Sequence, residues 1–273
     1  MLFLSVYAYL VLMDIETWLR AVGDLVMPRT CLVCGRRLGL HEAYLCIRCA
    51  ADLPLTWYWG RRHHPMADRF NAMVERHRGG EYVTYIYAAA LLFYQEDYRQ
   101  VPWALKYRGD LGAGQHFARM LGERMAAASY WSDVDLVIPV PLHWTRHYLR
   151  GYNQAEVIAR EMAVCLGAPL RTDILVRTRR TRTQTRLSGE EKARNVASAF
   201  QVRRSIFAGQ SSHAFFPLEN ILPGKPSPLS TARHILLVDD TFTTGATLYA
   251  CYKALRSVTS SRISIATLSV VGA

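Results

Sequence analysis

A short segment near the C-terminus constrains the fold of this chain more than any other part of the sequence. Residues 235–238 are all apolar and predict a buried strand that ends at Asp239 and Asp240. The next five residues hold three threonines and one glycine, and helical periodicity begins at Thr247. A strand that turns tightly into a helix is the repeating unit of α/β proteins, whose ligands bind at the carboxyl ends of the strands.

The remainder of the chain alternates between predicted strands and predicted helices. Continuous or alternating apolar residues predict strands, and apolar residues at helical spacing predict helices. This alternation favours an α/β fold with a mostly parallel sheet flanked by helices and right-handed crossovers. We predict strands at 134–141, 174–176, 199–202, 234–238 and 263–271, and helices at 14–26, 97–107, 115–128, 153–166 and 247–255.

Three stretches do not follow that alternation. The segment 82–93 predicts a hairpin or a bent pair of edge strands. Residues 54–80 mix aromatic, arginine and histidine side chains with little periodicity, which indicates a linker or a docking surface. Residues 205–232 hold repeated prolines and glycines and indicate a loop insertion. The expected organisation is an apolar extension at 1–13, a helix with a cysteine module at 14–53, a linker at 54–80 and one α/β domain at 81–273.

The residues that follow the apolar strand suit a phosphate group. Gly245 allows a tight turn, and backbone amides at a helix N-terminus attract anions. Threonine hydroxyls within 243–247 would add further donors. Two carboxylates would repel that phosphate, so Asp239 and Asp240 are expected to face neutral groups, and the 2- and 3-hydroxyls of a ribose fit. The alternative interpretation is an ordinary strand-to-helix turn in which the aspartates cap the helix.

Four of the six cysteines form two Cys-x-x-Cys pairs near the N-terminus, separated by eleven residues. Four thiolates in two knuckles suit a tetrahedral zinc ion with no open position, so the expected role is structural. Two unrelated pairs of buried cysteines and a redox pair are the alternatives, and His41 or the His63-His64 pair would compete as ligands. The expected zinc ligands are Cys31, Cys34, Cys46 and Cys49.

Charge and cysteine usage restrict the surroundings of the chain. Lys and Arg outnumber Asp and Glu by 33 to 22, so the surface should attract phosphates on metabolites, nucleic acid or anionic lipid. The cysteine spacing favours a reducing, cytoplasmic compartment. The apolar opening stretch ends at Asp14, short of the ~20 residues of a membrane helix. It lacks a basic start and a cleavage site, so we expect no membrane span and no signal peptide, and a true start at Met13 explains the stretch more simply.

Taken in order, these motifs resemble the ComF family of competence proteins. Members of that family join an N-terminal zinc module to a type I phosphoribosyltransferase domain, and the resemblance extends over nearly the whole chain from about Met13. It rests on residues 31–34 and 46–49, Lys106-Tyr107, residues 139–143 and 150–155, Gln184, Asn195-Val196 and residues 238–247.

The resemblance implies a role for each motif in binding phosphoribosyl pyrophosphate. The ribose hydroxyls would be held by Asp239 and Asp240, and the 5-phosphate by Thr241, Thr243, Thr244, Gly245, Ala246 and Thr247. The pyrophosphate, with a magnesium ion, would meet the loop formed by Pro141, Leu142 and His143. A lid over the reacting carbon would include Arg182, Gln184 and Arg186. Catalysis would involve Asp239, Asp240, Lys106 and Arg150.

Three functions are consistent with these residues. The first is a phosphoribosyltransferase that acts on an unidentified nitrogen base or amine. The second, which the resemblance suggests, is a non-catalytic nucleic-acid-associated zinc protein of the DNA-uptake machinery. Its zinc module, its arginines and the aromatic residues near Trp57 and Trp59 would contact single-stranded DNA or a DNA-uptake helicase. The third is a regulator that binds the metabolite or a related nucleotide without turnover.

Overall fold

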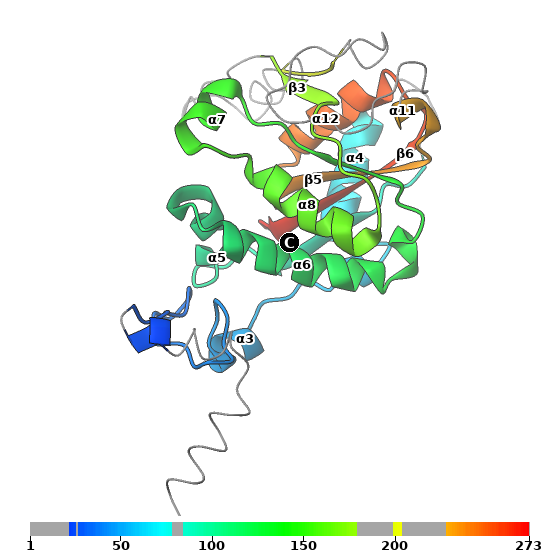
Figure 1. Cartoon of the computed structure of the whole chain (residues 1–273). Helices are drawn as coiled ribbons and strands as arrows, with labels where there is room; N and C mark the ends of the chain where they lie inside the picture. Colours follow the sequence, from blue (N-terminus) through cyan, green and yellow to red (C-terminus); the bar gives the residue numbers. More distant parts are fainter. Residues whose placement is uncertain (1–21, 26, 78–83, 179–198, 204–227, 273) are drawn as a thin grey trace, which may run out of the picture.

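The computed structural model describes residues 22–25, 27–77, 84–178, 199–203 and 228–272. At its centre lies a sheet of four parallel strands in the order β1-β6-β5-β2 (Figure 1). The strands are β1 (Ala88–Phe93), β2 (Leu136–Pro139), β5 (His234–Phe242) and β6 (Arg262–Val270). The predicted α/β fold with a mostly parallel sheet is therefore confirmed.

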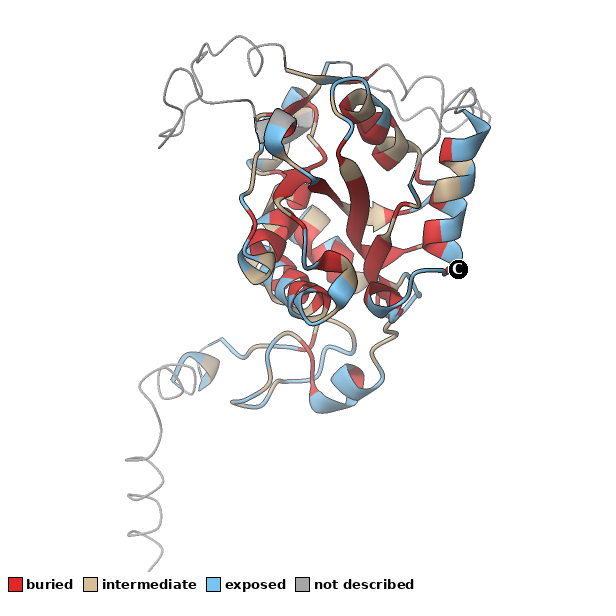
Figure 2. Cartoon of the chain, turned by 90° about the vertical axis from the view of Figure 1, so that its right-hand side faces the viewer, coloured by how far each residue is buried: buried red, intermediate tan, exposed pale blue. Residues whose placement is uncertain are grey.

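Helices cover both faces of this sheet. On one face α6 (Leu111–Ala126) and α8 (Gln154–Leu166) pack against the strands, and on the other α4 (Pro65–Arg76) and α12 (Ala246–Arg256) do so. Within β5, Leu236 and Val238 belong to the first of these cores, whereas Ile235 and Leu237 belong to the second. Because both faces are covered, the strand is a continuous apolar run. Figure 2 shows the buried residues filling the sheet and the inward sides of the helices.

The shorter elements surround this framework. Near the N-terminal module lie α3 (Ile47–Ala51) and η1 (Tyr58–Gly60). The connection from β1 to β2 holds α5 (Gln100–Trp103), the π-helical turn η2 (Ala104–Arg108) and η3 (Ser129–Trp131). Beyond β2 come α7 (Trp144–Arg150), then β3 (Leu175–Arg177) and β4 (Phe200–Val202), which pair with each other antiparallel, and α11 (Pro228–Thr231).

We had predicted a linker at 54–80, but the described part of this segment is structured. It contains η1 and α4, and α4 buries Met66, Phe70 and Val74 in the core of the sheet domain. His64 caps this helix by accepting a hydrogen bond from the backbone N–H of Ala67, and Pro65 occupies its first turn. The helix was missed because exposed charged residues separate its few apolar positions.

Two further predictions differ from the structure. In the run 82–93, residues 88–93 form the single strand β1, which pairs in parallel with β6, so the predicted hairpin is wrong for the described residues. The predicted helix 97–107 begins at Gln100 and changes to a π-helical turn at Ala104. Of the predicted helix 14–26, residues 22–25 are described and are helical. The extension 1–13 and most of the insertion 205–232 lie outside the described residues.

A buried polar cluster joins the strands at the edge of the sheet opposite their carboxyl ends. His234 contacts Ser264 through Nε2 at 2.8 Å and Asp133 through Nδ1 at 2.9 Å. Burial lowers the pKa of His234 despite the hydrogen bond to Asp133. His234 and Ser264 are both buried, so their contact joins the starts of β5 and β6 inside the sheet, whereas Asp133 is half exposed.

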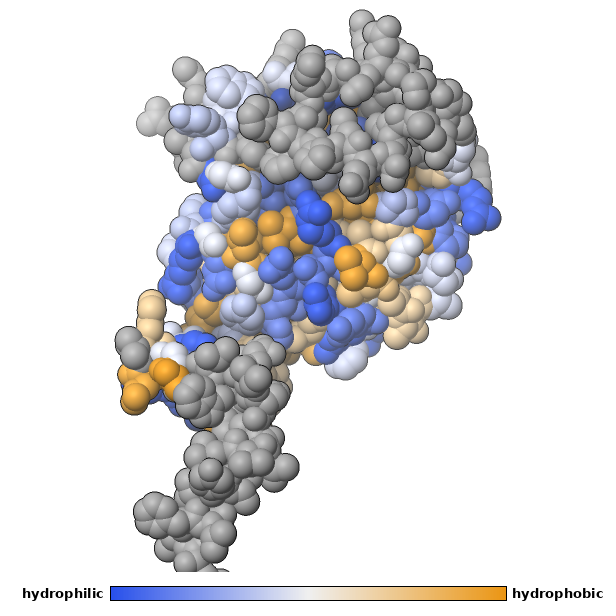
Figure 3. Space-filling model, in the orientation of Figure 1, coloured by the Kyte–Doolittle hydropathy of each residue, from blue (hydrophilic) through white to orange (hydrophobic). Residues whose placement is uncertain are grey.

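The face seen in Figure 3 is mostly hydrophilic, with separate apolar patches between the polar regions. The short N-terminal segment exposes two large apolar side chains, Leu25 and Met27. Among the described residues, no helix combines the length and the apolar character that a bilayer crossing requires.

Candidate functional site

Strand β5 carries both aspartates, because it continues to Phe242, four residues beyond its predicted end. Asp239 lies opposite Thr267 of β6 in the parallel register, and Thr241 lies opposite Ser269. Consecutive side chains of a strand point to opposite faces, so the two carboxyl groups have different neighbours. The site thus begins on a strand whose backbone position is fixed from both sides by β6 and β2.

Asp239 has an unusual protonation equilibrium. Burial of its carboxyl group, followed by the nearby carboxylate of Asp240, raises the pKa of Asp239 to about 7. The positive charges of Lys106 and Arg177 act in the opposite direction. The Asp239 side chain also accepts a hydrogen bond of 2.9 Å from the backbone N–H of Asp240. A carboxyl group of this kind changes charge near neutral pH, which is typical of functional sites.

Lys106 lies beside the second aspartate although it is distant in the sequence. Its Nζ atom is 3.0 Å from Oδ2 of Asp240 and 3.5 Å from Oγ1 of Thr241. The hydroxyl of Ser269 in turn donates to Thr241 at 3.1 Å. Lys106 belongs to η2, and single π-helical turns are frequent at functional sites. The side chains of both Lys106 and Asp240 are largely shielded from solvent, so their pairing is screened less than a surface ion pair.

The loop after β5 leads directly into the first turn of α12. Gly245 is the N-cap residue and has a φ of +80°, a backbone conformation that glycine adopts without strain. A Cβ atom there would lie 2.9 Å from Cζ of Phe242, so a larger residue would also collide with the core. Thr243 and Thr244 are exposed beside the N-terminus of this helix, whose first turn contains no acidic residue. The loop therefore offers a positive helix dipole and hydroxyl donors to an anion.

Arg69 of α4 supports this loop, and the sequence reasoning missed it. Its guanidinium donates to the backbone oxygen of Thr243 at 3.0 Å and to that of Gly272 at 2.6 Å. It also lies over the ring of Phe242, 5.5 Å from the ring centroid. The helical spacing of the apolar residues after Pro65 was the signal that would have placed Arg69 on a packed helix.

The loop predicted to meet a pyrophosphate follows β2 on the neighbouring strand. Pro141 and Leu142 line a cavity of about 330 Å³, which is also bounded by Arg177 and Arg203. Asn153 fixes the start of this loop by donating to the backbone oxygen of Val140 at 3.0 Å. The cavity thus combines apolar walls with two guanidinium groups at the carboxyl end of the sheet.

The other predicted residues of this region have different positions. His143 is buried and its Nδ1 atom contacts the hydroxyl of Thr145 at 2.9 Å, so its ring stabilises the loop. The guanidinium of Arg150 lies over the ring of Tyr107 at 5.6 Å from the centroid. The predicted lid residues Arg182, Gln184 and Arg186 lie outside the described residues, between β3 and β4.

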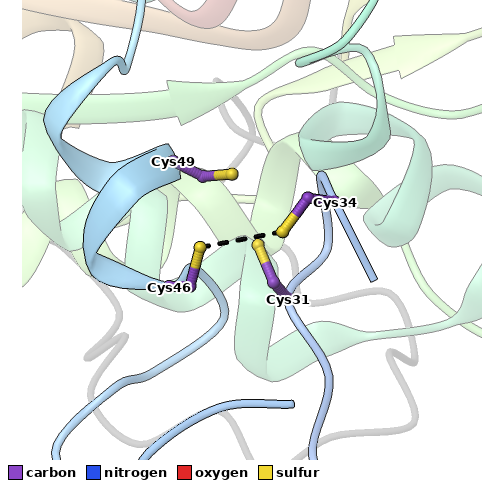
Figure 4. Close-up of side chains that lie close together, drawn as sticks. All are labelled: Cys31, Cys34, Cys46 and Cys49. Atoms are coloured by element: carbon purple, nitrogen blue, oxygen red, sulfur yellow. Dashed lines mark hydrogen bonds between the residues drawn. The ribbon is translucent and has the colours of Figure 1, made fainter. Parts of the chain in front are cut away.

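In the N-terminal module, the four cysteines converge on one point (Figure 4). Their sulfur atoms all lie within 4.8 Å of one another, and the Sγ atoms of Cys34 and Cys46 are 3.7 Å apart. A tetrahedral zinc site with Zn–S bonds of about 2.3 Å has sulfur–sulfur edges of about 3.8 Å. The backbone N–H of Cys49 lowers the pKa of the Cys46 thiol to about 6, whereas burial raises the pKa of the Cys49 thiol. A metal ligand must be a thiolate, so binding of a metal would release the thiol protons. The cluster therefore fits a four-coordinate zinc ion.

The histidines that were considered as competing ligands are not part of this cluster. His64 is buried, caps α4 and contacts the backbone oxygen of Ala88, whereas His41 and His63 are exposed. The second knuckle is completed by α3, for which Cys46 is the N-cap residue. Four cysteines alone thus make up the metal-binding group found among the described residues.

Comparison with known proteins supports a relationship to competence proteins. No family model matches the chain. The chain is 32% identical over 124 residues to Competence protein F of Haemophilus influenzae, which covers 45% of each protein. A second relative, DNA utilization protein YhgH of Escherichia coli (strain K12), is 29% identical over 114 residues, which cover 42% of this chain and 40% of that protein.

These matches are partial, because the chain spans less than half the length of the curated relatives. Among solved structures, the protein TT1426 from Thermus thermophilus matches with a TM-score of 0.31 and 16% identity, over 58% of this chain and 81% of that chain.

The structure brings together a group of residues that lie far apart in the sequence. Lys106, Asp239, Asp240 and Thr241 come from two elements and form one cluster at the carboxyl end of the sheet. The neighbouring cavity adds Arg203, which the sequence reasoning had not singled out. No local pattern marked Arg203, because it follows a strand of only three residues.

Proposed function

We propose that this chain binds phosphoribosyl pyrophosphate, or a related ribose 5-phosphate compound, at the carboxyl end of its sheet. The observation that carries this proposal is the cluster of Asp239, Asp240 and Lys106 beside the Gly245 turn. The turn and the first amides of α12 would receive the 5-phosphate. The aspartates would accept hydrogen bonds from the two ribose hydroxyls, and the cavity beside Pro141 would receive the pyrophosphate.

Phosphoribosyl transfer is the reaction that these residues would support. A bond forms between an acceptor nitrogen and C1 of the ribose, while the C1–oxygen bond breaks and pyrophosphate leaves with the electron pair. A bound magnesium ion would neutralise charge on the departing pyrophosphate. Lys106 would leave its ion pair with Asp240 and interact with a phosphate oxygen of the bound ligand. Arg177 and Arg203 would add positive charge along the cavity. Ionised Asp239 would hold the ribose in position.

Thermal stability in the presence of phosphoribosyl pyrophosphate and magnesium tests this proposal. A ligand that binds only the folded chain raises the unfolding midpoint, because at 100 times its Kd it adds about 2.7 kcal/mol of stability. We expect an increase at millimolar ligand for the native chain. The double variant Asp239→Asn, Asp240→Asn should show no increase while its zinc content stays unchanged. A native chain whose midpoint does not move at millimolar ligand contradicts the proposal.

The names of the relatives support a role in competence or DNA utilization. We infer a ComF-type role in DNA uptake or nucleotide metabolism in a reducing, cytoplasmic compartment, with a structural zinc ion on the four cysteines. Binding of the ligand without turnover would instead favour a regulator that senses the metabolite.

A second candidate function, contact with single-stranded nucleic acid, is favoured by one surface feature. The rings of Trp103 and Tyr107 are exposed, and their centroids lie 5.3 Å apart. Arg108 lies over Trp103 at 5.2 Å and Arg150 over Tyr107 at 5.6 Å. In these four side chains, here called the aromatic ladder, two neighbouring rings lie between two cations. Single-stranded nucleic acid is bound by this combination, because arginines attract phosphates and aromatic rings stack on bases.

The aromatic ladder replaces the aromatic residues that the sequence had suggested for this contact. Trp59 is buried, and its backbone oxygen accepts a hydrogen bond of 2.8 Å from the indole N–H of Trp131. Trp57 is exposed, and its ring lies against that of the buried Trp59. Of the two tryptophans, only Trp57 therefore offers an exposed ring to a partner.

Removing the two rings of the aromatic ladder should weaken binding of a single-stranded oligonucleotide. Stacking contributes about 1–3 kcal/mol per base, so the double variant Trp103→Ala, Tyr107→Ala should bind at least about tenfold more weakly in a fluorescence anisotropy titration. The matched control is Trp57→Ala, which removes an exposed ring elsewhere and should change the affinity less than about twofold. Affinity that does not depend on salt, or an equal loss in both variants, contradicts this second function.

A further inference from the structure

The cysteine module contacts the sheet domain at both ends of the segment that carries Lys106. That segment, here called the Lys106 segment, runs from Tyr98 to His116 and includes α5, η2 and the first turns of α6. Its two ends meet residues 44–49, which include the second cysteine pair. A module that contacts both ends of a segment restricts the positions available to the residues between them.

The first contact is a buried hydrogen bond. The hydroxyl of Tyr98 donates to the backbone oxygen of Cys49 at 3.0 Å, and Tyr98 is almost fully buried. The backbone oxygen of Tyr98 accepts from the N–H of Val101 at 3.1 Å, so this residue forms the turn that starts α5. Because Cys49 belongs to the four-cysteine cluster, the position of Tyr98 depends on the folded state of that cluster.

The second contact is a close fit between a ring and a glycine. A Cβ atom on Gly112 would overlap the hydroxyl of Tyr44, so a larger residue there would displace this ring. The ring of Tyr44 also lies 5.2 Å from that of His116, one turn further along α6. The backbone oxygen of Tyr44 accepts from the N–H of Leu32 at 2.8 Å, which joins Tyr44 to the first knuckle.

Between these contacts the backbone runs through α5 and the π-helical turn η2, a rare geometry that is often found at functional sites. Leu105 is held from two directions, by the hydroxyl of Tyr152 on its backbone oxygen and by Gly114 against its side chain. The next residue is Lys106, which reaches Asp240 at 3.0 Å. The orientation of Lys106 therefore depends on how the whole segment is seated.

We propose that the cysteine module positions Lys106 toward Asp240 and the bound ligand, and that Tyr98 and Tyr44 are the positioning residues. This inference rests on the proposed ligand site. It gives the metal module a role in ligand binding beyond the stability of its own fold, since loss of the module would release both ends of the Lys106 segment.

Hydrogen exchange and a double-mutant cycle test the inference. Tyr98→Phe removes only the hydroxyl and should raise amide exchange in residues 100–110 by about fivefold to tenfold, the range expected for one lost hydrogen bond. It should weaken phosphoribosyl pyrophosphate binding by a similar factor while zinc content stays unchanged. The matched control is Tyr94→Phe, which alters an exposed tyrosine and should leave exchange and affinity unchanged.

The double-mutant cycle separates positioning from simple docking. In a Lys106→Ala background, Tyr98→Phe should cause no further loss of affinity, because the side chain that it positions is absent. Gly112→Ala, which displaces the Tyr44 ring, should reproduce the effects of Tyr98→Phe. Equal losses of affinity with and without Lys106, or faster exchange confined to residues 44–55, would overturn the inference. If the native chain binds no phosphoribosyl pyrophosphate, the proposed function is contradicted but the inference about Lys106 is not. The hydrogen-exchange comparison of Tyr98→Phe with Tyr94→Phe then tests whether the module positions the Lys106 segment.

Discussion

At pH 8, an Asp239→Asn variant should unfold at a higher temperature than the native chain and should no longer bind phosphoribosyl pyrophosphate. Burial and the Asp240 carboxylate raise the pKa of Asp239 to about 7, so its ionised form is unfavourable in the folded chain. Asparagine has a similar shape and carries no charge at any pH. A variant that is more stable but does not bind the ligand would show that the charge of Asp239 serves ligand binding at a cost in folding stability.

The sign of the pH dependence follows from the raised pKa. In the unfolded chain an aspartate titrates near pH 3.9, so between about pH 4 and pH 7 the folded chain binds a proton that the unfolded chain does not. The stability that Asp239 contributes is complete below about pH 4 and is lost as the pH rises through about 7. The difference in unfolding midpoint between Asp239→Asn and the native chain should therefore increase from pH 5 to pH 8.

The control for this prediction is Asp68→Asn, for which the expected sign is opposite. The hydroxyl of Tyr85 donates to Asp68 at 2.6 Å and lowers the pKa of that carboxyl group. The contribution of Asp68 is present above about pH 4 and is lost at lower pH, so its removal should destabilise the chain at pH 8. Differential scanning calorimetry of the three proteins at pH 5, 6.5 and 8 measures these differences. A midpoint gain for Asp239→Asn that is equal at all three values would contradict the predicted pKa.

A Cys46→Ser variant should lose its zinc and the folded structure of the cysteine module. The four sulfur atoms lie within 4.8 Å of one another, and Cys46 is the thiol whose pKa is lowered to about 6. Replacing one of four ligands should weaken zinc binding by at least about 100-fold, since changes even outside the ligand shell cost about 10-fold to 100-fold. Because metal binding and folding of such a module are coupled, its amides should exchange freely.

Elemental analysis and hydrogen exchange measure this outcome. Native protein should contain one zinc ion per chain and the variant almost none, with fast exchange across residues 29–52. The matched control is Cys165→Ser, which alters a cysteine of α8 outside the cluster and should keep the full zinc content. Full zinc retention in Cys46→Ser would show that the four thiols are not the metal site.

Local signals in the sequence were sufficient for the central elements of the fold. The apolar run 235–238, the glycine at 245 and the helical periodicity after Thr247 depend only on neighbouring residues, and they predicted the strand, the turn and α12. The same is true of the Cys-x-x-Cys spacing, because each knuckle forms from a few consecutive residues. The boundaries were less accurate: β5 continues through both aspartates, since pairing with β6 extends the strand beyond its apolar part.

The tertiary structure alone decided how the site is assembled. The family resemblance pointed to Lys106 as a site residue. No sequence pattern predicts that its Nζ atom lies 3.0 Å from Asp240, because that contact joins a π-helical turn to a strand. Arg69 was hidden in a segment predicted to be a linker, since a helix with few apolar residues is stable only when it packs. The raised pKa of Asp239 likewise depends on burial and on neighbours brought together by folding. The sequence by itself determined which groups were present and which elements carried them, whereas their distances, burial and protonation depended on long-range packing.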